Sequence, residues 1–176
     1  GNYNTAIGPN SLAATTGNYN TAIGPNSLKA NTLGIRNTAV GFNTLSLNSI
    51  SDDNTAIGDS VLTVNTGKQN TGIGSLSLTT NTIGYSNTSI GYKSSYLNLS
   101  GNSNVSIGDS SLYTNSVGTD NISIGVNSLY LSTGSSNISL GTQSLFNNVA
   151  SENIAIGTNS SKGNTSGTPN ISIGHM

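Results

Sequence analysis

Four aromatic residues recur at a regular interval in the second half of the chain: Tyr96, Tyr113, Tyr130 and Phe146. This spacing places them at one position of four consecutive repeats, and strand alternation predicts that the position faces outward. Exposed aromatic surface commonly marks a binding site, including sites where a sugar ring stacks on the side chain. An aromatic ladder that only stabilises the stack is the alternative. We therefore treat these four residues as candidate ligand-binding residues.

Candidates for catalysis are scarce. The chain has one histidine, His175, no cysteine and six acidic residues. Glycoside cleavage needs two carboxyl groups about 5 to 10 Å apart. Asp59 and Asp109 occupy the same repeat position, but they are separated by three repeats, or roughly 14 Å at strand spacing. Solenoids that bind calcium carry Asp in their glycine-rich repeats, and no such Asp recurs here. The sequence therefore predicts no enzymatic activity, no metal site and no cofactor.

Composition argues against two classes of partner. Only 6% of the residues are charged, the net charge is -1, and the five Lys and Arg residues are scattered along the chain. Binding to phosphate backbones needs clustered Lys and Arg, so we predict no nucleic-acid partner. No apolar run approaches the roughly 18 residues that indicate a membrane-spanning helix. We therefore predict that this segment does not insert into a membrane.

One five-residue phrase organises the whole chain. It first appears as Asn4-Thr5-Ala6-Ile7-Gly8 and returns ten more times, always after a 16-residue or a 17-residue step. The later copies begin at Asn20, Asn37, Asn54, Asn70, Asn87, Asn104, Asn121, Asn137, Asn153 and Asn170. A period this constant is typical of one supersecondary unit that stacks into a solenoid.

Each repeat is predicted to hold two short strands. The residue before the phrase glycine is Ile, Val or Leu in every copy, and the residue two positions earlier is Thr in the first six copies and Val or Ile in the last five. Residues two apart share one face of a strand, and these types suit a buried position, so we expect this face to point inward. A column of Leu from Leu12 to Leu145 predicts a second inward strand. The expected fold is an all-β parallel β-solenoid of eleven coils.

The repeats run without interruption, so residues 1–174 are predicted to form a single repeat domain. The chain begins and ends within the pattern, which we interpret as a fragment of a longer protein. His175 and Met176 depart from the pattern and are interpreted as a cloning remnant, residues 175–176.

Glycine and asparagine mark the turns. Gly stands three residues before the phrase in nine of the eleven copies, which predicts a backbone position with positive φ. Asn recurs six residues before the phrase, for example at Asn31, Asn48 and Asn81. Stacked Asn side chains can hydrogen bond along a solenoid as a ladder. We attribute the difference between the short and the long repeat to one residue gained or lost in this outer turn.

The middle residue of the phrase is always small. Its neighbours are expected to point inward, so this column is expected to face outward and to allow close approach by another subunit. Tight strand packing within one chain is the alternative. The predicted subunit interface consists of Ala6, Ala22, Ala39, Ala56, Gly72, Ser89, Ser106, Ser123, Ser139, Ala155 and Ser172.

The phrase N-T-A-I-G followed by x-x-S-L, as in residues 20–28, resembles the head repeat of YadA-type trimeric autotransporter adhesins, which also occurs in phage and giant-virus fibre proteins. The resemblance covers essentially the whole chain. It implies a left-handed parallel β-roll, a side-by-side homotrimer, and an extracellular location on a bacterial cell surface or a virion fibre. It also implies attachment to a host or cell surface through a glycan or protein receptor. The repeat departs from the family, whose usual head repeat is somewhat shorter.

Two other functions fit the pattern. β-Solenoids can present flat Thr arrays that bind ice, but the best Thr column here, Thr5 to Thr88, is expected to share the inward face with Ile. An inert rigid spacer of a fibre is the other alternative, because low charge and abundant Asn and Ser also suit a spacer. Binding through outward columns, summed over several chains, would distinguish a recognition module from a spacer.

Overall fold

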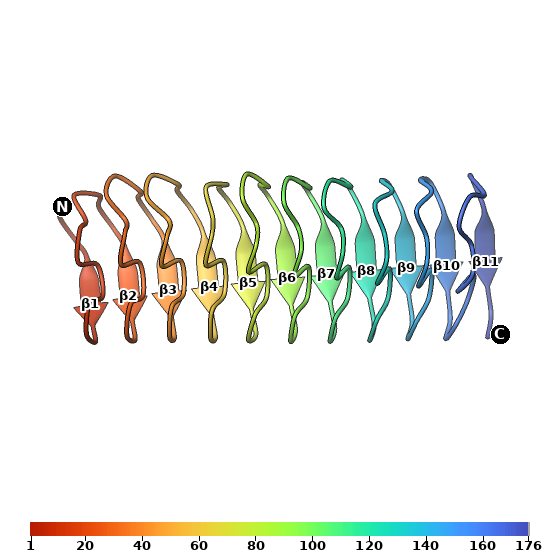
Figure 1. The fold of residues 1–176 in the computed structure, drawn as a ribbon, viewed down its shortest axis with the longest axis horizontal. Coiled ribbons are helices and arrows are strands. Elements are labelled where there is room, and N and C mark those ends of the chain that lie inside the picture. The colour runs from red at the N-terminus through yellow and green to blue at the C-terminus, as the bar shows by residue number, and fades with distance from the viewer. Residues whose placement is uncertain (176) are drawn as a thin grey trace.

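A computed structural model describes residues 1–175; Met176, half of the predicted cloning remnant, lies outside the described residues. Eleven three-residue strands form one sheet, and the coils stack along a straight rod with the two termini at opposite ends (Figure 1). The strands are β1 (Thr5–Ile7), β2 (Thr21–Ile23), β3 (Thr38–Val40), β4 (Thr55–Ile57), β5 (Thr71–Ile73), β6 (Thr88–Ile90), β7 (Val105–Ile107), β8 (Ile122–Ile124), β9 (Ile138–Leu140), β10 (Ile154–Ile156) and β11 (Ile171–Ile173).

Every strand pairs in parallel with the strand of the next coil. The order of strands in the sheet follows their order in the chain, and equivalent residues of the phrase pair with one another, as Thr21 does with Thr38 and Ile23 with Val40. At about 4.8 Å per coil, eleven coils make a rod roughly 50 Å long. The predicted all-β parallel β-solenoid is confirmed, and none of residues 1–175 is helical.

Each coil holds one strand, and the prediction of a second strand is wrong. The segment around Leu12 and its equivalents is a series of turns. The Leu of this column has a positive φ, for example 48° at Leu45, which is the left-handed region and not an extended conformation. Its backbone N–H still bonds to the next coil, because Leu28 N donates to the carbonyl oxygen of Thr44 at 3.0 Å. The coils therefore stay in register here without a strand.

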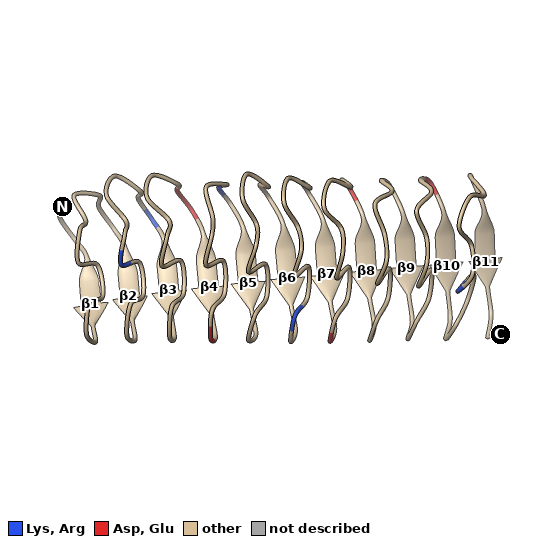
Figure 2. Cartoon of the chain, viewed as in Figure 1, with Lys and Arg blue, Asp and Glu red and all other residues tan. Residues whose placement is uncertain are grey.

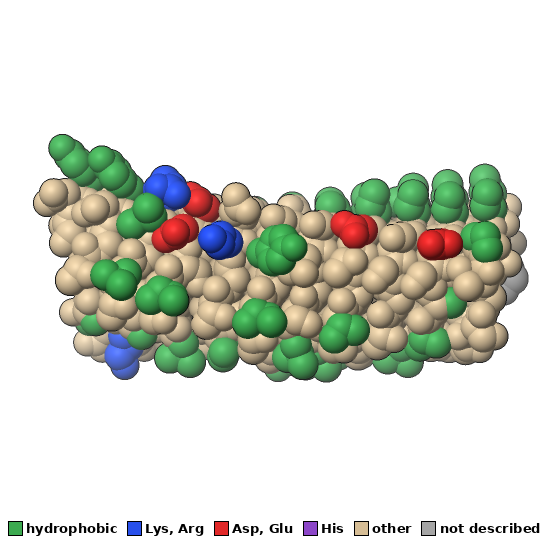
Figure 3. Space-filling view, turned by 90° about the horizontal axis from the view of Figure 1, so that it is seen from above, with side chains coloured by type: hydrophobic (Ala, Val, Ile, Leu, Met, Phe, Trp, Pro, Cys, Tyr) green, Lys and Arg blue, Asp and Glu red, His purple; other side chains and the backbone are tan. Residues whose placement is uncertain are grey.

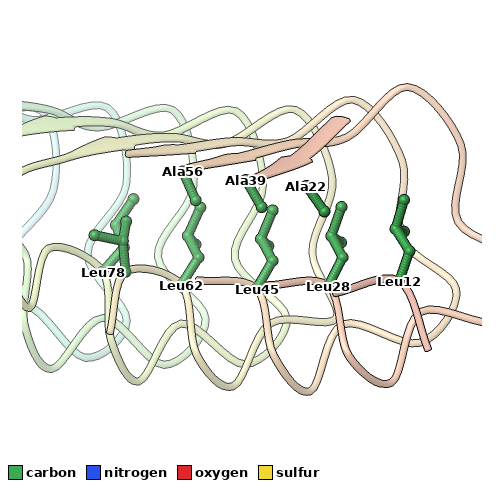
Figure 4. Packing of buried hydrophobic residues seen from close by; sticks show 9 residues of the cluster. Leu12, Ala22, Leu28, Ala39, Leu45, Ala56, Leu62 and Leu78 are labelled. Carbon is green, nitrogen blue, oxygen red and sulfur yellow. The ribbon is translucent and has the colours of Figure 1, made fainter. Parts of the chain in front are cut away.

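The strands face the opposite way from the prediction. The small middle residue points into the rod and is fully buried at Ala22, Ala39 and Ala56, whereas the flanking Thr and Ile columns lie at the surface. Figure 4 shows these three alanines directed at the Leu side chains of the turn segment. A coil this short encloses room for one Leu between its two walls, so only Ala, Gly or Ser fits opposite that Leu. Alternation shows that neighbours face opposite ways, but not which face is inside.

Two columns of asparagine form hydrogen-bonded ladders within the rod. In the first ladder, built from the Asn that opens each phrase, Asn104 Oδ1 accepts from the backbone N–H of Asn121 at 3.0 Å. Asn104 Nδ2 donates to the carbonyl oxygen of Gly118 at 2.9 Å. The second ladder follows the predicted column in the 17-residue coils, where Asn98 Nδ2 donates to Asn81 Oδ1 at 2.6 Å. In the 16-residue coils it instead uses the Asn five residues before the phrase, as at Asn65 and Asn148. Buried polar groups need such partners, and the first ladder continues from Asn4 to Asn170.

The second ladder explains the two repeat lengths. Its position lies eleven residues after the first Asn of the phrase in each coil and is occupied by Thr15, Asn31, Asn48, Asn65, Asn81, Asn98, Asn115, Ser132, Asn148 and Asn164. From there to the next phrase the distance is five or six residues. The extra residue therefore lies in the outer turn, as predicted.

The glycines three residues before the phrase allow the backbones of neighbouring coils to approach closely, and they do not have positive φ. An added Cβ at Gly17 would lie 2.0 Å from the carbonyl oxygen of Gly34, and one at Gly84 would lie 2.5 Å from that of Gly101. Positive φ instead occurs at the phrase glycine, with 120° at Gly24. The prediction of positive φ at this column is wrong. Glycine is favoured here because the backbone of one coil lies directly against the backbone of the next, which leaves little room for a side chain.

Candidate functional site

The small-residue column predicted as a subunit interface lies inside the coil. Every member from Ala22 to Ala155 is buried, and Ala6 and Ser172 belong to the two end coils. In the C-terminal half the Ser hydroxyls of this column bond across the interior, where Ser123 Oγ donates to the carbonyl oxygen of Ser128 at 2.8 Å. The interface prediction is therefore wrong, because side chains inside one coil do not reach another subunit. The correction applies to Ala6, Ala22, Ala39, Ala56, Gly72, Ser89, Ser106, Ser123, Ser139, Ala155 and Ser172.

The outer face of the sheet carries two straight rows of side chains. One row is the aliphatic column from Ile7 to Ile173, and the other is the Thr, Val and Ile column from Thr5 to Ile171. Both rows are half-buried or exposed in every strand, and Ile124 in β8 is 39% exposed. Nothing within residues 1–175 covers this face. It is the surface that the sequence-based prediction assigned to the interior.

One of the two rows changes character along the rod. The row that begins at Thr5 is Thr in β1 to β6, and it is Val105, Ile122, Ile138, Ile154 and Ile171 in β7 to β11. Figure 3 shows hydrophobic side chains gathered in a row along one edge of the C-terminal half. The C-terminal half therefore presents an aliphatic strip two side chains wide. The N-terminal half presents one row of Thr beside one aliphatic row.

The four predicted aromatic residues form one continuous stack on the outside of the rod. All four are half-buried. Ring centroids lie 5.3 Å apart for Tyr96 and Tyr113, 4.9 Å for Tyr113 and Tyr130, and 5.1 Å for Tyr130 and Phe146, with nearly parallel rings. Each ring covers a face of its neighbour, so ring edges and phenol hydroxyls are what a ligand can reach. This geometry favours the stabilising ladder, because sugar stacking needs a free ring face.

Sequence reasoning missed a second stack and the cations beside the first. Tyr3 and Tyr19 stack with their centroids 5.1 Å apart, and the signal was their shared position one residue before the phrase. At one end of the long ladder Lys93 Nζ lies 5.9 Å from the ring centroid of Tyr96, and at the other Lys162 Nζ lies 5.7 Å from that of Phe146. Cation–π contacts at exposed sites contribute about 0.5–1 kcal/mol each.

Charged side chains are few and spread along the rod (Figure 2). Arg36 Nε donates to Asp53 Oδ1 at 2.6 Å, and Arg36 Nη2 donates to Asp53 Oδ2 at 2.9 Å. The hydrogen bond from Arg36 lowers the pKa of Asp53 below its ordinary value. The side chain of Arg36 is 53% exposed and that of Asp53 is 35% exposed, so solvent screens the pair and it contributes little to stability.

Groups for catalysis or metal binding do not converge in the described part of the chain. Among residues 1–175, no three His, Cys, Asp or Glu side chains lie close enough together to hold a metal ion. The same residues include no helix of the length and apolarity needed to span a membrane. The chain matches no family model and no curated protein, and its fold matches no solved structure.

Proposed function

We propose that this chain is the rod-like head of a homotrimeric fibre that attaches a cell or a virion to a surface. The observation that carries the proposal is the uncovered outer face of the sheet, which runs the whole length of the rod. Three rods packed side by side through this face would cover both rows of side chains. Cyclic symmetry is the common way to close such an interface.

The outer face is one continuous strip that can supply the centre of an interface. Three-residue strands are about 10 Å long and the sheet is about 50 Å wide, which gives a flat strip of roughly 500 Å² per chain. This area equals the largest apolar patch of a typical monomer, about 300–600 Å², and is smaller than the roughly 800 Å² per partner of a standard interface. The side chains of the two rows project from the flat strip, and together with the residues that flank it they would supply the remaining buried area.

The repeat supports attachment as the role of the trimer. The phrase and its x-x-S-L continuation resemble the heads of trimeric adhesins and of viral fibres. In this arrangement the receptor, a cell-surface glycan or protein, would contact the turns that remain outside the interface. Weak contacts repeated on three chains would add up to firm attachment. The protein would work outside the cell or on the virion.

Solution mass by light scattering tests the trimer. We expect a mass near three times the 17.8 kDa of one chain. Ile124→Lys in β8 should give monomers, because it places a charge in the strip. Leu131→Lys is the matched control, since Leu131 lies in a turn and is similarly exposed at 43%, and it should leave the trimer intact. A monomeric unsubstituted protein would reject the proposal.

One observation favours ice binding as a second candidate. The Thr row of β1 to β6 faces outward on a parallel sheet, so the objection that it points inward no longer holds. Its hydroxyl and methyl groups repeat at about 4.8 Å along the rod. We expect thermal hysteresis that Thr38→Lys abolishes and that the matched Ile138→Lys leaves unchanged. A trimer that buries this face would be without hysteresis, so the two candidates give opposite results.

A further inference from the structure

A hollow opens on the outside of the rod at the turn after β4. It has a volume of about 430 Å³ and is lined by Thr66, Gly67, Lys68, Gln69, Ile83 and Tyr85. Its origin is the repeat length, because residues 54–69 form a 16-residue coil between two 17-residue coils. The longer turns on either side project Ile50 and Ile83, which are 60% and 64% exposed, and of these two Ile83 lines the hollow. The short turn between them leaves the space.

We infer that this hollow binds a sugar ring that carries a carboxylate, such as a hexuronic acid within a surface glycan. The inference rests on the proposed recognition function and names a ligand class for it. Pockets of about 300–1,000 Å³ hold small ligands, so the space suits one or two sugar rings. The lining brings together a cation, an amide, a phenol and an aliphatic side chain, which are the groups that an acidic sugar requires.

Lys68 supplies the positive charge. It is exposed, and the salt bridge found within residues 1–175 joins Arg36 to Asp53 instead. The acids of the preceding coil are engaged elsewhere, since Asp53 accepts two hydrogen bonds from Arg36 and Asp52 Oδ1 accepts from the backbone N–H of Ile35 at 2.9 Å. The charge of Lys68 acts on Asp53, but within residues 1–175 its ammonium makes no ion pair, so it can meet a carboxylate through a charge-assisted contact, which is a strong one.

Tyr85 supplies the free ring face that the long aromatic ladder lacks. Its side chain is 49% exposed, and the aromatic stacks within residues 1–175 are formed by other rings. A tyrosine offers an apolar face for the C–H side of a sugar and a hydroxyl at its tip. Gln69 beside it offers both a donor and an acceptor. The hollow thus separates the two parts of the ligand, with the carboxylate at Lys68 and the ring at Tyr85.

The test is an NMR titration of the intact chain with three probes: methyl glucuronide, methyl glucoside and inorganic phosphate. Methyl glucuronide should shift the backbone amides of Lys68, Gln69 and Tyr85. Methyl glucoside should bind about tenfold more weakly because it has no carboxylate for the charged hydrogen bond. Phosphate alone should shift only the amides near Lys68, and more weakly.

Two variants and two matched controls separate the contributions. Lys68→Gln should remove the preference for glucuronide over glucoside, and Tyr85→Ser should weaken both sugars by about tenfold. Lys29→Gln and Tyr92→Ser should change neither affinity, since both control residues are exposed elsewhere on the rod and Tyr92 is exposed to a similar extent, 47%. Equal effects of Lys68→Gln and Lys29→Gln would mean general charge attraction and would overturn the inference.

The outcome also separates this inference from the trimer. Light scattering on the same sample gives the mass independently of sugar binding. A trimer whose amides do not shift with methyl glucuronide refutes the sugar site and leaves the fibre head in place. A monomer that binds methyl glucuronide at Lys68 and Tyr85 supports the sugar site and refutes the trimer.

Discussion

The two halves of the rod place their hydroxyl groups on opposite sides of the same sheet. The strands read mainly Thr-Ala-Ile in β1 to β6, with Thr outside and Ala inside. They read mainly Ile-Ser-Ile in β7 to β11, with Ile outside and Ser inside. The backbone pairing is the same in both halves. One strand geometry therefore tolerates both arrangements.

This difference between the two halves shows which residue requirements come from the interior of the coil and which come from its outer surface. Inside, the position is small in every coil, and in the C-terminal half its hydroxyls are bonded, as where Ser106 Oγ donates to the carbonyl oxygen of Ser111 at 2.8 Å, whereas the buried Ser89 Oγ in β6 has no partner within residues 1–175. The N-terminal half mainly has Ala packed on Leu at this position. Outside, the coil places no such demand, and the row is Thr in β1 to β6 and aliphatic in β7 to β11. In the proposed trimer, the interface would be more apolar and contain less water in the C-terminal half than in the N-terminal half.

The largest effect should come from removing the core leucine in each half. Leu45 and Leu129 are both fully buried, and Leu45 packs in a cluster with Ala39 and Ala56. Leu45→Ala should lower the free energy of unfolding by about 4 kcal/mol and Leu129→Ala by about 3 kcal/mol. The difference arises because a cavity beside Ser hydroxyls can admit water. Urea denaturation measures both, and a larger cost for Leu129→Ala would contradict the comparison.

A single exchange between Thr and Ile in the outer row that begins at Thr5 should change the free energy of association by about 1–2 kcal/mol per chain. Ile138→Thr in β9 should weaken the trimer, because it removes aliphatic area from the strip. Thr38→Ile in β3 should strengthen it for the opposite reason. The concentration dependence of the mass in sedimentation gives both values. If neither substitution changes the mass, the sheet face is not the interface.

Gly72 lies between the coils with Ala at the inner strand position and the coils that mainly have Ser there. A Cβ at this position would lie 2.6 Å from Val61 Cγ1 of the preceding coil, and Val61 occupies a position that is Ser in most coils. Gly72→Ala should therefore cost about 1–3 kcal/mol by overpacking. Val61→Ser in the same chain should recover most of this loss. A double-mutant cycle by thermal denaturation measures the coupling, and additive effects would show that the two side chains do not compete.

Ser132 interrupts the second Asn ladder in the C-terminal half. Asn115 Oδ1 and Ser132 Oγ are buried without a hydrogen-bond partner, because the Ser side chain is too short to span the gap. Ser132→Asn should restore the ladder and raise the free energy of unfolding by about 1 kcal/mol. Asn98→Ser, in an unbroken part of the ladder, is the matched control and should lower it. A destabilised Ser132→Asn variant would mean that the site lacks room for the longer side chain.

The smallest effect should be that of pH, and it should be confined to the N-terminal half. The pKa of Asp53 is lowered by Arg36, so the pair stabilises the fold above the unfolded-state pKa of about 3.9 and loses this contribution as the pH falls through the lower folded-state value. Solvent exposure keeps the contribution small. Arg36→Gln should raise the pKa of Asp53 toward its ordinary value in an NMR titration. An unchanged pKa would show that the pair is not formed in solution.

The sequence by itself determined the period, the parallel stacking, the Asn ladder, the outward aromatic column and the place of the extra residue. These follow from covalent spacing, because equal steps along the chain put equal residues in register. Tertiary structure decided which face of the strand is inside, since that depends on the width of a closed coil and on the left-handed turn that aims Leu45 at Ala39. Tertiary structure also decided that the aromatic rings cover one another and that a short turn leaves a hollow at Lys68. The sequence shows which coils are short, but the space that remains between side chains of neighbouring coils depends on their packing in three dimensions.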